Sequence, residues 1–182
     1  MSAVEIVADE RATLTRYAEK LCHDRLQAYQ AAPHDAREHA NVEESVLAGG
    51  YAYRQIAELV QNAADAVVEG GAPSGRIVVL VDALGLWAAN TGEPVDEAGV
   101  LALLNANTSG KRSGQIGRFG LGFKSLLKLG GDIAVLSRSV CLLFDPLACR
   151  SRIRRLLSLR EDQPAPGLRL AAACPWEEGL AI

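Results

Sequence analysis

The chain has 182 residues, of which 49% are hydrophobic and 23% charged, a length and composition typical of one globular domain. Its 19 basic and 22 acidic residues leave a net charge of -3, so no overall positive field favours nucleic acid or an anionic membrane as a partner. No apolar run approaches the ~20 residues of a membrane span, and the acidic N-terminus does not resemble a secretion signal. We therefore predict a cytoplasmic protein without a membrane partner.

The four cysteines, Cys22, Cys141, Cys149 and Cys174, form no C-x-x-C pair. They are too sparse for a disulfide scaffold or a zinc site. We predict that they are buried, reduced thiols, because free cysteine is commonly a small buried hydrophobe. Pairing of Cys141 with Cys149 across a loop is the alternative.

Three helices are expected in the N-terminal part of the chain. Apolar side chains recur at helical spacing over residues 14–29, and Pro33 ends that run. A more polar helix over 35–48 closes at two glycines, and a third helix extends over about 51–70.

Short apolar runs predict strands in the second half of the chain. Residues 77–81 form a β-branched run suited to a buried strand, which 86–89 continues as a hairpin. A short helix is expected over 121–129, followed by strands at 133–136 and 140–144.

The remaining segments are predicted from their composition. Residues 105–122 are rich in Gly, Ser, Asn and Thr, as expected of a mobile loop. Asp145 and Pro146 open a helix, 161–167 has the prolines and glycine of a linker, and 168–173 is a candidate last strand.

The first chemically informative pattern lies on the third helix. Glu58, Asn62, Asp65 and Glu69 fall at positions i, i+4, i+7 and i+11 and form one polar stripe. The other faces carry the apolar residues Ile56, Leu59, Val60, Ala63 and Val67, which are expected to bury the helix on a sheet. A carboxylate so placed can deprotonate a water, and an amide oxygen one turn away can bind Mg²⁺. A solvated helix edge with local hydrogen bonds is the alternative.

The second pattern is a run of three glycines, Gly117, Gly120 and Gly122, that leads into a helix. Backbone N-H groups without neighbouring Cβ atoms can approach a phosphate closely, and the helix start favours an anion. The run is not a Walker A loop, because Phe123 separates Gly122 from Lys124.

The third pattern follows the predicted hairpin, where Asn90 and Gly92 lie in the stretch Asn-Thr-Gly-Glu-Pro. An asparagine at a strand end can recognise the edge of a base, and a glycine permits close approach of a flat ring. A simple β-turn explains this stretch equally well.

In order, these patterns resemble the three nucleotide-binding boxes of the GHKL ATPases, which include gyrase, heat-shock protein 90, histidine kinases and MutL. The matching residues are Glu58-Leu59-x-x-Asn62-Ala63-x-Asp65-Ala66, then Asn90-x-Gly92, then Gly117-x-Phe119-Gly120-x-Gly122-Phe123-x-Ser125. Glu58 places the resemblance in the branch of heat-shock protein 90 and MutL. The stretch 90–94 is most similar to sacsin-type N-terminal ATPase domains. The resemblance covers about residues 51–144.

This resemblance implies an α/β (α+β) two-layer sandwich, the Bergerat fold, with a mixed, mostly antiparallel sheet covered on one face by helices. Residues 1–50 are then a helical N-terminal cap and 51–145 the nucleotide-binding core with a lid at 105–118. Residues 146–182 supply a C-terminal helix and a possible strand. The implied activity is Mg²⁺-dependent hydrolysis of ATP to ADP that drives a conformational switch. The implied partners are a second copy of the chain, bound through the N-terminal region and lid, and a client protein or further domains.

The resemblance also assigns roles to residues. Glu58 is implied as the general base, Asn62 as the Mg²⁺ ligand, and Asp65 with Ala66 as the adenine side of the pocket. Asn90 stands where the family has an aspartate that reads adenine, so base recognition is expected to be weaker or altered. Gly92 completes that box.

The lid and the glycine box are implied to hold the phosphates. Thr108, Ser109 and Lys111 lie in the lid and are expected to contact phosphates on closure. The backbone amides that face the phosphates belong to the glycine box: Gly117, Arg118, Phe119, Gly120, Leu121, Gly122 and Phe123. The side chains of Arg118 and Lys124 either screen phosphate charge or are exposed.

Two other functions remain in view. A nucleotide-binding or nucleotide-free scaffold that works by protein contact is favoured by Asn90 and by the short C-terminal region. A histidine kinase fits poorly, because His23, His34 and His39 are more simply surface residues.

Overall fold

The computed structural model describes residues 3–48, 54–71, 74–105 and 121–174. These residues form a mixed α and β structure, which confirms the predicted class. In chain order the elements are α1 (Ala3–Ala31), α2 (Pro33–Ala48), α3 (Gln55–Glu69), β1 (Ile77–Val81), β2 (Leu86–Asn90), α4 (Glu97–Leu104), α5 (Leu121–Lys124), the 3-10 helix η2 (Ser125–Leu129), β3 (Ile133–Leu136), β4 (Cys141–Phe144), α6 (Pro146–Leu157) and β5 (Ala172–Ala173).

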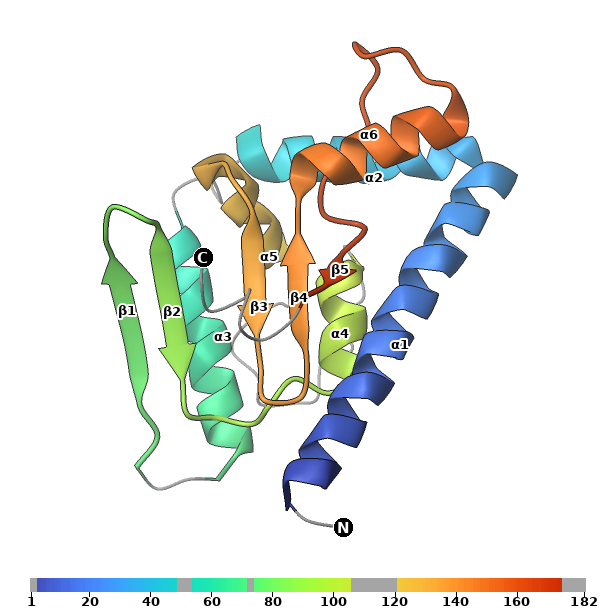
Figure 1. The fold of residues 1–182 in the computed structure, drawn as a ribbon. Helices are drawn as coiled ribbons and strands as arrows, with labels where there is room; N and C mark the ends of the chain where they lie inside the picture. The colour runs from blue at the N-terminus through green and yellow to red at the C-terminus, as the bar shows by residue number, and fades with distance from the viewer. Residues whose placement is uncertain (1–2, 49–53, 72–73, 106–120, 175–182) are drawn as a thin grey trace.

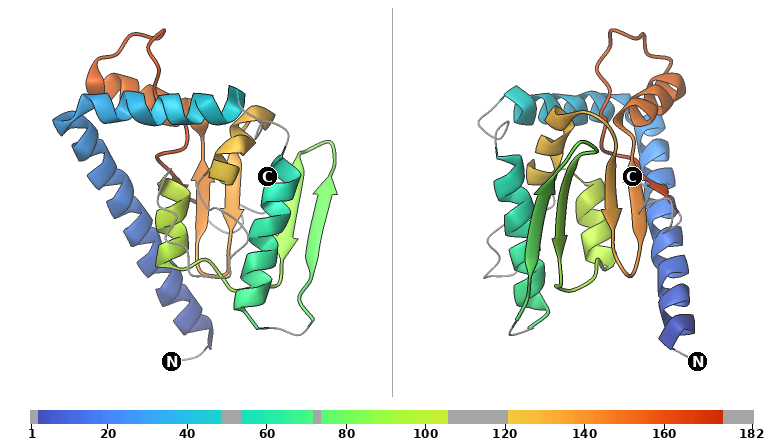
Figure 2. Two further views of the ribbon diagram at one scale, coloured as in Figure 1. Left: turned by 180° about the vertical axis from the view of Figure 1, so that it is seen from behind. Right: turned by 60° about the vertical axis from the view of Figure 1, so that its left-hand side comes forward.

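The described strands form two separate antiparallel sheets, β1-β2 and β3-β4-β5. In the first, Val79 pairs with Ala88, and in the second Val135 pairs with Leu142. Figure 1 shows the two sheets side by side, with β2 nearest to β3. In the left view of Figure 2, seen from behind, α3, α4 and α5 lie in front of the strands, while α1 runs along one edge and α2 and α6 cross one end.

One hydrophobic core joins the N-terminal helix to the rest of the chain. The buried positions of α1 are Leu14, Ala18, Cys22, Leu26 and Tyr29, which follow helical spacing and form one face. They belong to the same cluster as Leu142 and Phe144 of β4 and Ile153 of α6.

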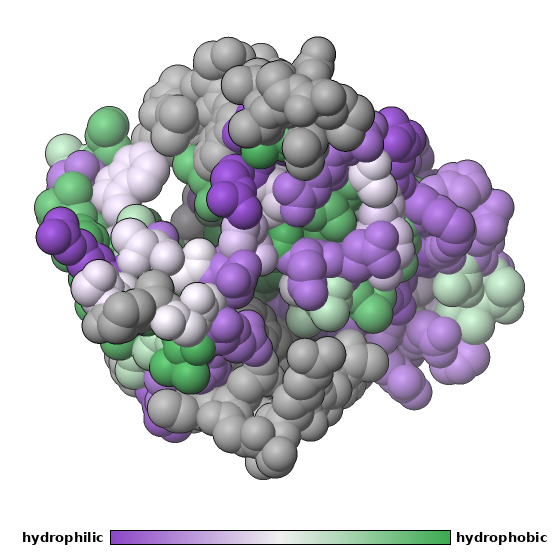
Figure 3. Space-filling model, turned by 90° about the horizontal axis from the view of Figure 1, so that it is seen from below, coloured by the Kyte–Doolittle hydropathy of each residue, from purple (hydrophilic) through white to green (hydrophobic). Residues whose placement is uncertain are grey.

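The predicted hairpin is confirmed, but the burial of its first strand is not. All five residues of β1 are exposed, Val81 by 66% and Val78 by 59%. The β-branched run specifies a strand. However, β1 pairs only with β2, and no other described strand covers its outer edge. Seen from below, hydrophobic residues reach the surface on the side of this hairpin (Figure 3).

Helix α4 is an element that the sequence analysis did not assign. Its start is stabilised by Asp96, whose side chain accepts a hydrogen bond from the Gly99 N-H at 2.8 Å. Its sequence, EAGVLALL, is apolar on several faces, and Val100, Leu103 and Leu104 are buried. Helix α6 begins as predicted, with Asp145 accepting from the Ala148 N-H.

The predicted linker at 161–167 is wrong in its second half. Ala165, Pro166 and Gly167 are buried, and the buried stretch continues to Leu170 without regular secondary structure. The predicted strand over 168–173 is reduced to β5. Side chains from several helices replace the backbone partners that a sheet would supply.

Those side chains come from four elements. Glu43 of α2 accepts hydrogen bonds from the Gly167 N-H at 2.6 Å and the Leu168 N-H at 3.1 Å. The Leu168 carbonyl accepts from the Lys124 ammonium of α5. The thiols of Cys149 and Cys22 donate to the carbonyls of Pro166 and Ala171. The buried segment is therefore a structural part of the core.

The prediction of four reduced cysteines is wrong for two of them. Cys141 of β4 forms a disulfide with Cys174, which follows β5. The pairing of β4 with β5 brings the two together, a proximity that the sequence spacing does not reveal. Cys22 and Cys149 are free and buried, as expected, so the alternative pair Cys141–Cys149 is absent.

His39 is not the surface residue that was predicted. Its Nδ1 lies 2.7 Å from the Tyr29 hydroxyl, and its ring is partly buried between α2 and α1. Burial, followed by the positive charges of Arg169 and Arg25, lowers the pKa of His39 to about 4.

We expect the buried carboxylate of Glu43 to be essential for stability. Replacing it in Glu43→Ala leaves the Arg169 guanidinium buried without its ion-pair partner at 3.6 Å and removes the acceptor of two backbone N-H groups. The free energy of unfolding, measured by urea denaturation, should fall by about 3 to 5 kcal/mol. The neighbouring exposed Glu44→Ala should change it by less than ~0.5 kcal/mol. Equal effects of the two substitutions would contradict the role given to Glu43.

The low pKa of His39 predicts a pH dependence of stability. The unfolded histidine titrates near 6.5, so between pH ~6.5 and ~4 the unfolded state binds the extra proton and stability falls as the pH falls. The loss amounts to roughly 1 to 2 kcal/mol after allowance for solvent screening of the half-buried ring. Urea denaturation at pH 7, 6 and 5 should show a shallower decline for His39→Gln than for the exposed control His34→Gln. A decline of the same steepness in both variants would refute this assignment.

Candidate functional site

The predicted polar stripe of α3 faces the interior at two of its positions. Glu58 is 6% exposed and Asp65 5% exposed, with Asn62 half-buried between them. Ile56, predicted to face a sheet, is instead 51% exposed. The helix is therefore rotated so that carboxylates, and not its first apolar residue, enter the interior.

Gly122, the last residue of the three-glycine run, packs against Glu58 of α3. A Cβ atom added to Gly122 would lie 2.8 Å from Glu58 Cδ and 3.0 Å from Glu58 Cβ, and still closer to Oε2. These distances are below normal contact, so only glycine fits at this position without displacing Glu58. The start of α5 and the buried carboxylate are thus in direct contact.

Gly92, in the stretch after β2, packs against the same helix. A Cβ atom added there would overlap the α3 backbone at Ala66 and Val67. The next residue, Glu93, donates its backbone N-H to the Ala66 carbonyl at 2.9 Å. The loop after β2 is therefore fixed on α3 one turn beyond Asn62.

Asn90 takes part in the turn that the sequence analysis gave as the alternative. Its side-chain oxygen accepts a hydrogen bond from the Gly92 N-H at 2.9 Å, and the residue is exposed. This oxygen is the atom expected to read adenine. Base recognition would require it to leave the turn or to accept a second hydrogen bond.

The most informative atom of the site is the side-chain oxygen of Asn62. It is buried, and no hydrogen-bond donor among the described residues reaches it. Buried polar atoms in folded proteins almost always have a partner, so an orphaned acceptor indicates a missing donor, water or cation. Asn62 lies one helical turn from Glu58 and is the residue that was predicted to bind Mg²⁺.

Gln55 is a buried residue that the sequence analysis missed. It is 9% exposed, lies almost one turn before Glu58, and donates from Nε2 to the Ser125 carbonyl at 3.4 Å. Ser125 in turn donates from Oγ to the Gly122 carbonyl at 2.6 Å. Gln55 thus connects α3 to the glycine box and holds Gly122 near Glu58. Its spacing of three residues from Glu58 was the available signal.

Lys124 contradicts both roles that were considered for it. It is fully buried, and its ammonium donates to the carbonyls of Leu103 at 3.1 Å and Leu168 at 2.6 Å. Burial, followed by the charge of Arg169, lowers the pKa of Lys124 to about 7. It neither screens phosphate nor solubilises the surface. Phe123 is likewise buried and packs edge-on against Phe144, with 5.0 Å between the ring centroids.

Several predicted nucleotide-binding residues lie outside the described residues. They are Thr108, Ser109, Lys111, Gly117, Arg118, Phe119 and Gly120. Neither the cavity between α1 and α4 nor the one between α2 and the segment after α6 is lined by Glu58, Asn62 or Gly92. In the same part of the chain, no three His, Cys, Asp or Glu side chains are grouped as a metal site, and no helix is long and apolar enough to cross a membrane.

Comparison with models of known protein families, with curated proteins and with solved structures finds no match to this chain. The site is therefore interpreted from its own geometry and from the sequence resemblance.

The glycine contacts predict that both positions are intolerant of a side chain. Gly92→Ala should lower the free energy of unfolding by roughly 2 to 3 kcal/mol, because the new methyl group meets rigid backbone. Gly122→Ala should cost less, about 1 to 2 kcal/mol, because Glu58 can partly move away. The control is Gly99→Ala, where the added Cβ meets only side-chain atoms, Val95 Cγ1 at 3.0 Å and Asp96 Oδ1 at 3.4 Å. Urea denaturation that ranks Gly99→Ala as the most harmful would contradict these contacts.

Proposed function

We propose that this chain is an ATP-binding domain of the GHKL type, with a Bergerat fold, that hydrolyses ATP with the help of Mg²⁺. The observation that carries the proposal is the buried, partnerless oxygen of Asn62, one turn from the buried carboxylate of Glu58. The sequence resemblance predicted a cation ligand and a general base at these two positions.

The residues present fit a magnesium ion. Mg²⁺ prefers oxygen ligands and is commonly held by one or two protein oxygens together with substrate phosphates and waters. A single orphaned amide oxygen is therefore a sufficient protein contribution. When bound, the ion would neutralise charge that develops on the transferred phosphoryl group.

Glu58 is suited to accept the proton of an attacking water. It is buried on the helix that also carries Asn62, so the base and the cation ligand share one rigid element. The absence of a side chain at Gly122 allows the backbone at the start of α5 to approach this carboxylate. Catalysis would then depend mainly on positioning, supported by the bond from Gln55 to Ser125.

The layering of the described elements supports this fold assignment. Helices α3, α4 and α5 lie on one side of the strands, as in a fold whose strands are covered by helices on one face (Figure 2). Association of two copies and the handling of a client protein are part of the same proposal, because closure of the lid over ATP would be the event that drives them.

A second candidate function is a scaffold that works by protein contact. The exposed strand β1 favours it, since an apolar edge strand is a template for pairing with another chain. In this case the domain would bind its partner independently of nucleotide.

Calorimetry with ATP, in the presence and absence of Mg²⁺, tests the proposal directly. We expect binding that depends on Mg²⁺ in the wild-type chain and loss of this dependence in Asn62→Ala. The control is the adjacent Gln61→Ala, which should bind as the wild type does. Absence of ATP binding by a folded wild-type chain would refute the proposal and favour the scaffold.

Release of phosphate tests the role of Glu58 separately. Glu58→Gln should retain ATP affinity and lose turnover by about 10²-fold or more, because the amide cannot accept the proton. Glu69→Gln, at the exposed end of the same helix, should leave turnover unchanged. If Glu58→Gln hydrolyses ATP at the wild-type rate, Glu58 is not the base.

A further inference from the structure

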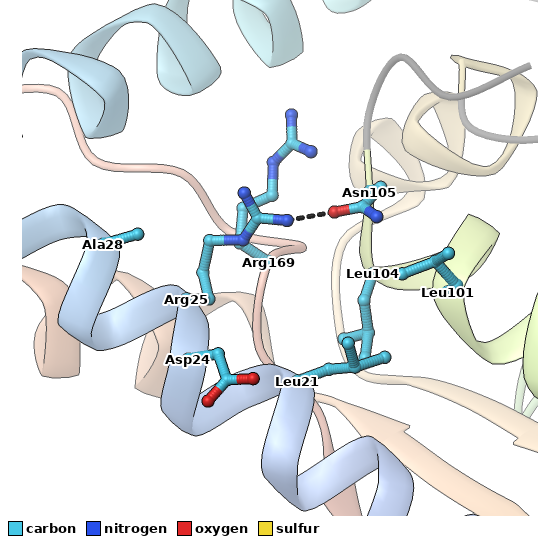
Figure 4. Close-up of a pocket in the computed structure, with 8 residues that line it drawn as sticks. All are labelled: Leu21, Asp24, Arg25, Ala28, Leu101, Leu104, Asn105 and Arg169. Atoms are coloured by element: carbon cyan, nitrogen blue, oxygen red, sulfur yellow. Dashed lines mark hydrogen bonds between the residues drawn. The ribbon is translucent and has the colours of Figure 1, made fainter.

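One cavity of the molecule is lined by two arginines, Arg25 and Arg169. It has a volume of about 180 Å³ and lies between α1, the C-terminal end of α4 and the buried segment that follows α6. Its polar lining comes from Asp24, Arg25, Asn105 and Arg169, and its apolar walls include Leu21 and Leu104 (Figure 4). Of the proposed nucleotide site, Asn105 at the start of the predicted lid lines this cavity, whereas Glu58, Asn62, Asn90 and Gly92 do not.

Arg169 is buried with donors that have no acceptor. The residue is 1% exposed, and its Nε and Nη2 atoms are buried without a hydrogen-bond partner among the described residues. Its ion-pair partner, Glu43, lies 3.6 Å from Nε, beyond hydrogen-bond distance. Both oxygens of that carboxylate already accept backbone N-H groups. Arg169 therefore has hydrogen-bond donors that are not used by the described residues.

A second guanidinium lies next to that of Arg169. Figure 4 shows the side chain of Arg25, from α1, turned toward Arg169, with a hydrogen bond to the side-chain oxygen of Asn105. Two buried or half-buried positive charges side by side repel each other unless an anion lies near both.

The nearby carboxylates do not balance this charge. Glu43 compensates one positive charge, that of Arg169, while Asp24 is exposed and pairs with Lys20 at 2.6 Å. The fully buried Lys124, which donates to the carbonyl of Leu168 directly before Arg169, is a third basic group nearby. The cavity is thus left with an excess of positive charge and with unused N-H donors.

We propose that this cavity is a binding site for a small oxyanion of the phosphate type, held by Arg25 and Arg169. Guanidinium groups present planar N-H donors that match phosphate oxygens in pairs, and they keep their charge when buried. Apolar walls from α1 and α4 exclude water and so strengthen the attraction. The ligand is either inorganic phosphate or the terminal phosphate of a small ester.

Calorimetry with inorganic phosphate at constant ionic strength tests the site. We expect binding to the wild-type chain and a loss of affinity of about tenfold or more in Arg25→Gln. Arg25 is chosen because its replacement leaves the Arg169–Glu43 pair intact. Arg16→Gln, on the exposed face of the same helix, should bind phosphate as the wild type does. Absence of phosphate binding, or equal binding by Arg25→Gln, would overturn the proposal.

Two further measurements separate this site from others. Asn62→Ala should keep its affinity for phosphate, because Asn62 lines the proposed nucleotide site and not this cavity; a loss there would place the phosphate in the nucleotide site and overturn the proposal. Competition with glycerol phosphate distinguishes the sources: displacement of inorganic phosphate identifies an ester site, and failure to displace identifies a site for the free ion.

Discussion

The carboxylate of Glu43 holds an irregular segment inside the core, and the packing of the C-terminal half of the chain depends on it. Residues 165–170 are buried, and no described strand pairs with them. Side chains from α1, α2, α5 and α6 supply the missing partners, with Glu43 accepting two of the N-H groups. One segment thereby ties four helices together. The same arrangement buries Arg169 and Lys124, whose charges must be compensated from within.

Helix α3 holds the residues of the proposed nucleotide site in place, as Glu43 holds the buried C-terminal segment. Two loops reach it closely, at Gly92 and Gly122, because neither glycine presents a Cβ atom to the helix. These contacts are made at backbone level or against a buried carboxylate, so they fix position more tightly than contacts between flexible side chains would. The site residues on α3 are accordingly held on a rigid element, and the hydrogen bonds through Gln55 and Ser125 extend that rigidity to α5.

Local pattern accounts for what could be predicted. The helical spacing of α1, the β-branched run of β1 and the Asp-Pro start of α6 are properties of neighbouring residues, and these elements form as expected. The contact of Gly122 with Glu58 was not predicted, because it joins residues that are far apart in the sequence. Long-range partners were not predictable: Lys124 follows a glycine box but is held by two carbonyls from other parts of the chain, and Pro166 and Gly167 have the composition of a linker but are buried. The disulfide of Cys141 depends in the same way on the pairing of β4 with β5.

Among the described residues, Asn62 and Arg169 have buried side-chain atoms without a hydrogen-bond partner, and the chemical requirements of these atoms are opposite. The oxygen of Asn62 is an acceptor and calls for a donor or a cation, whereas the Nε and Nη2 atoms of Arg169 are donors and call for an acceptor. They belong to different elements, and the cavity at Arg169 is not lined by any residue of α3. One small ion cannot satisfy both. The proposed nucleotide site and the proposed oxyanion site therefore rest on different atoms. If one proposal fails, the evidence for the other is unchanged.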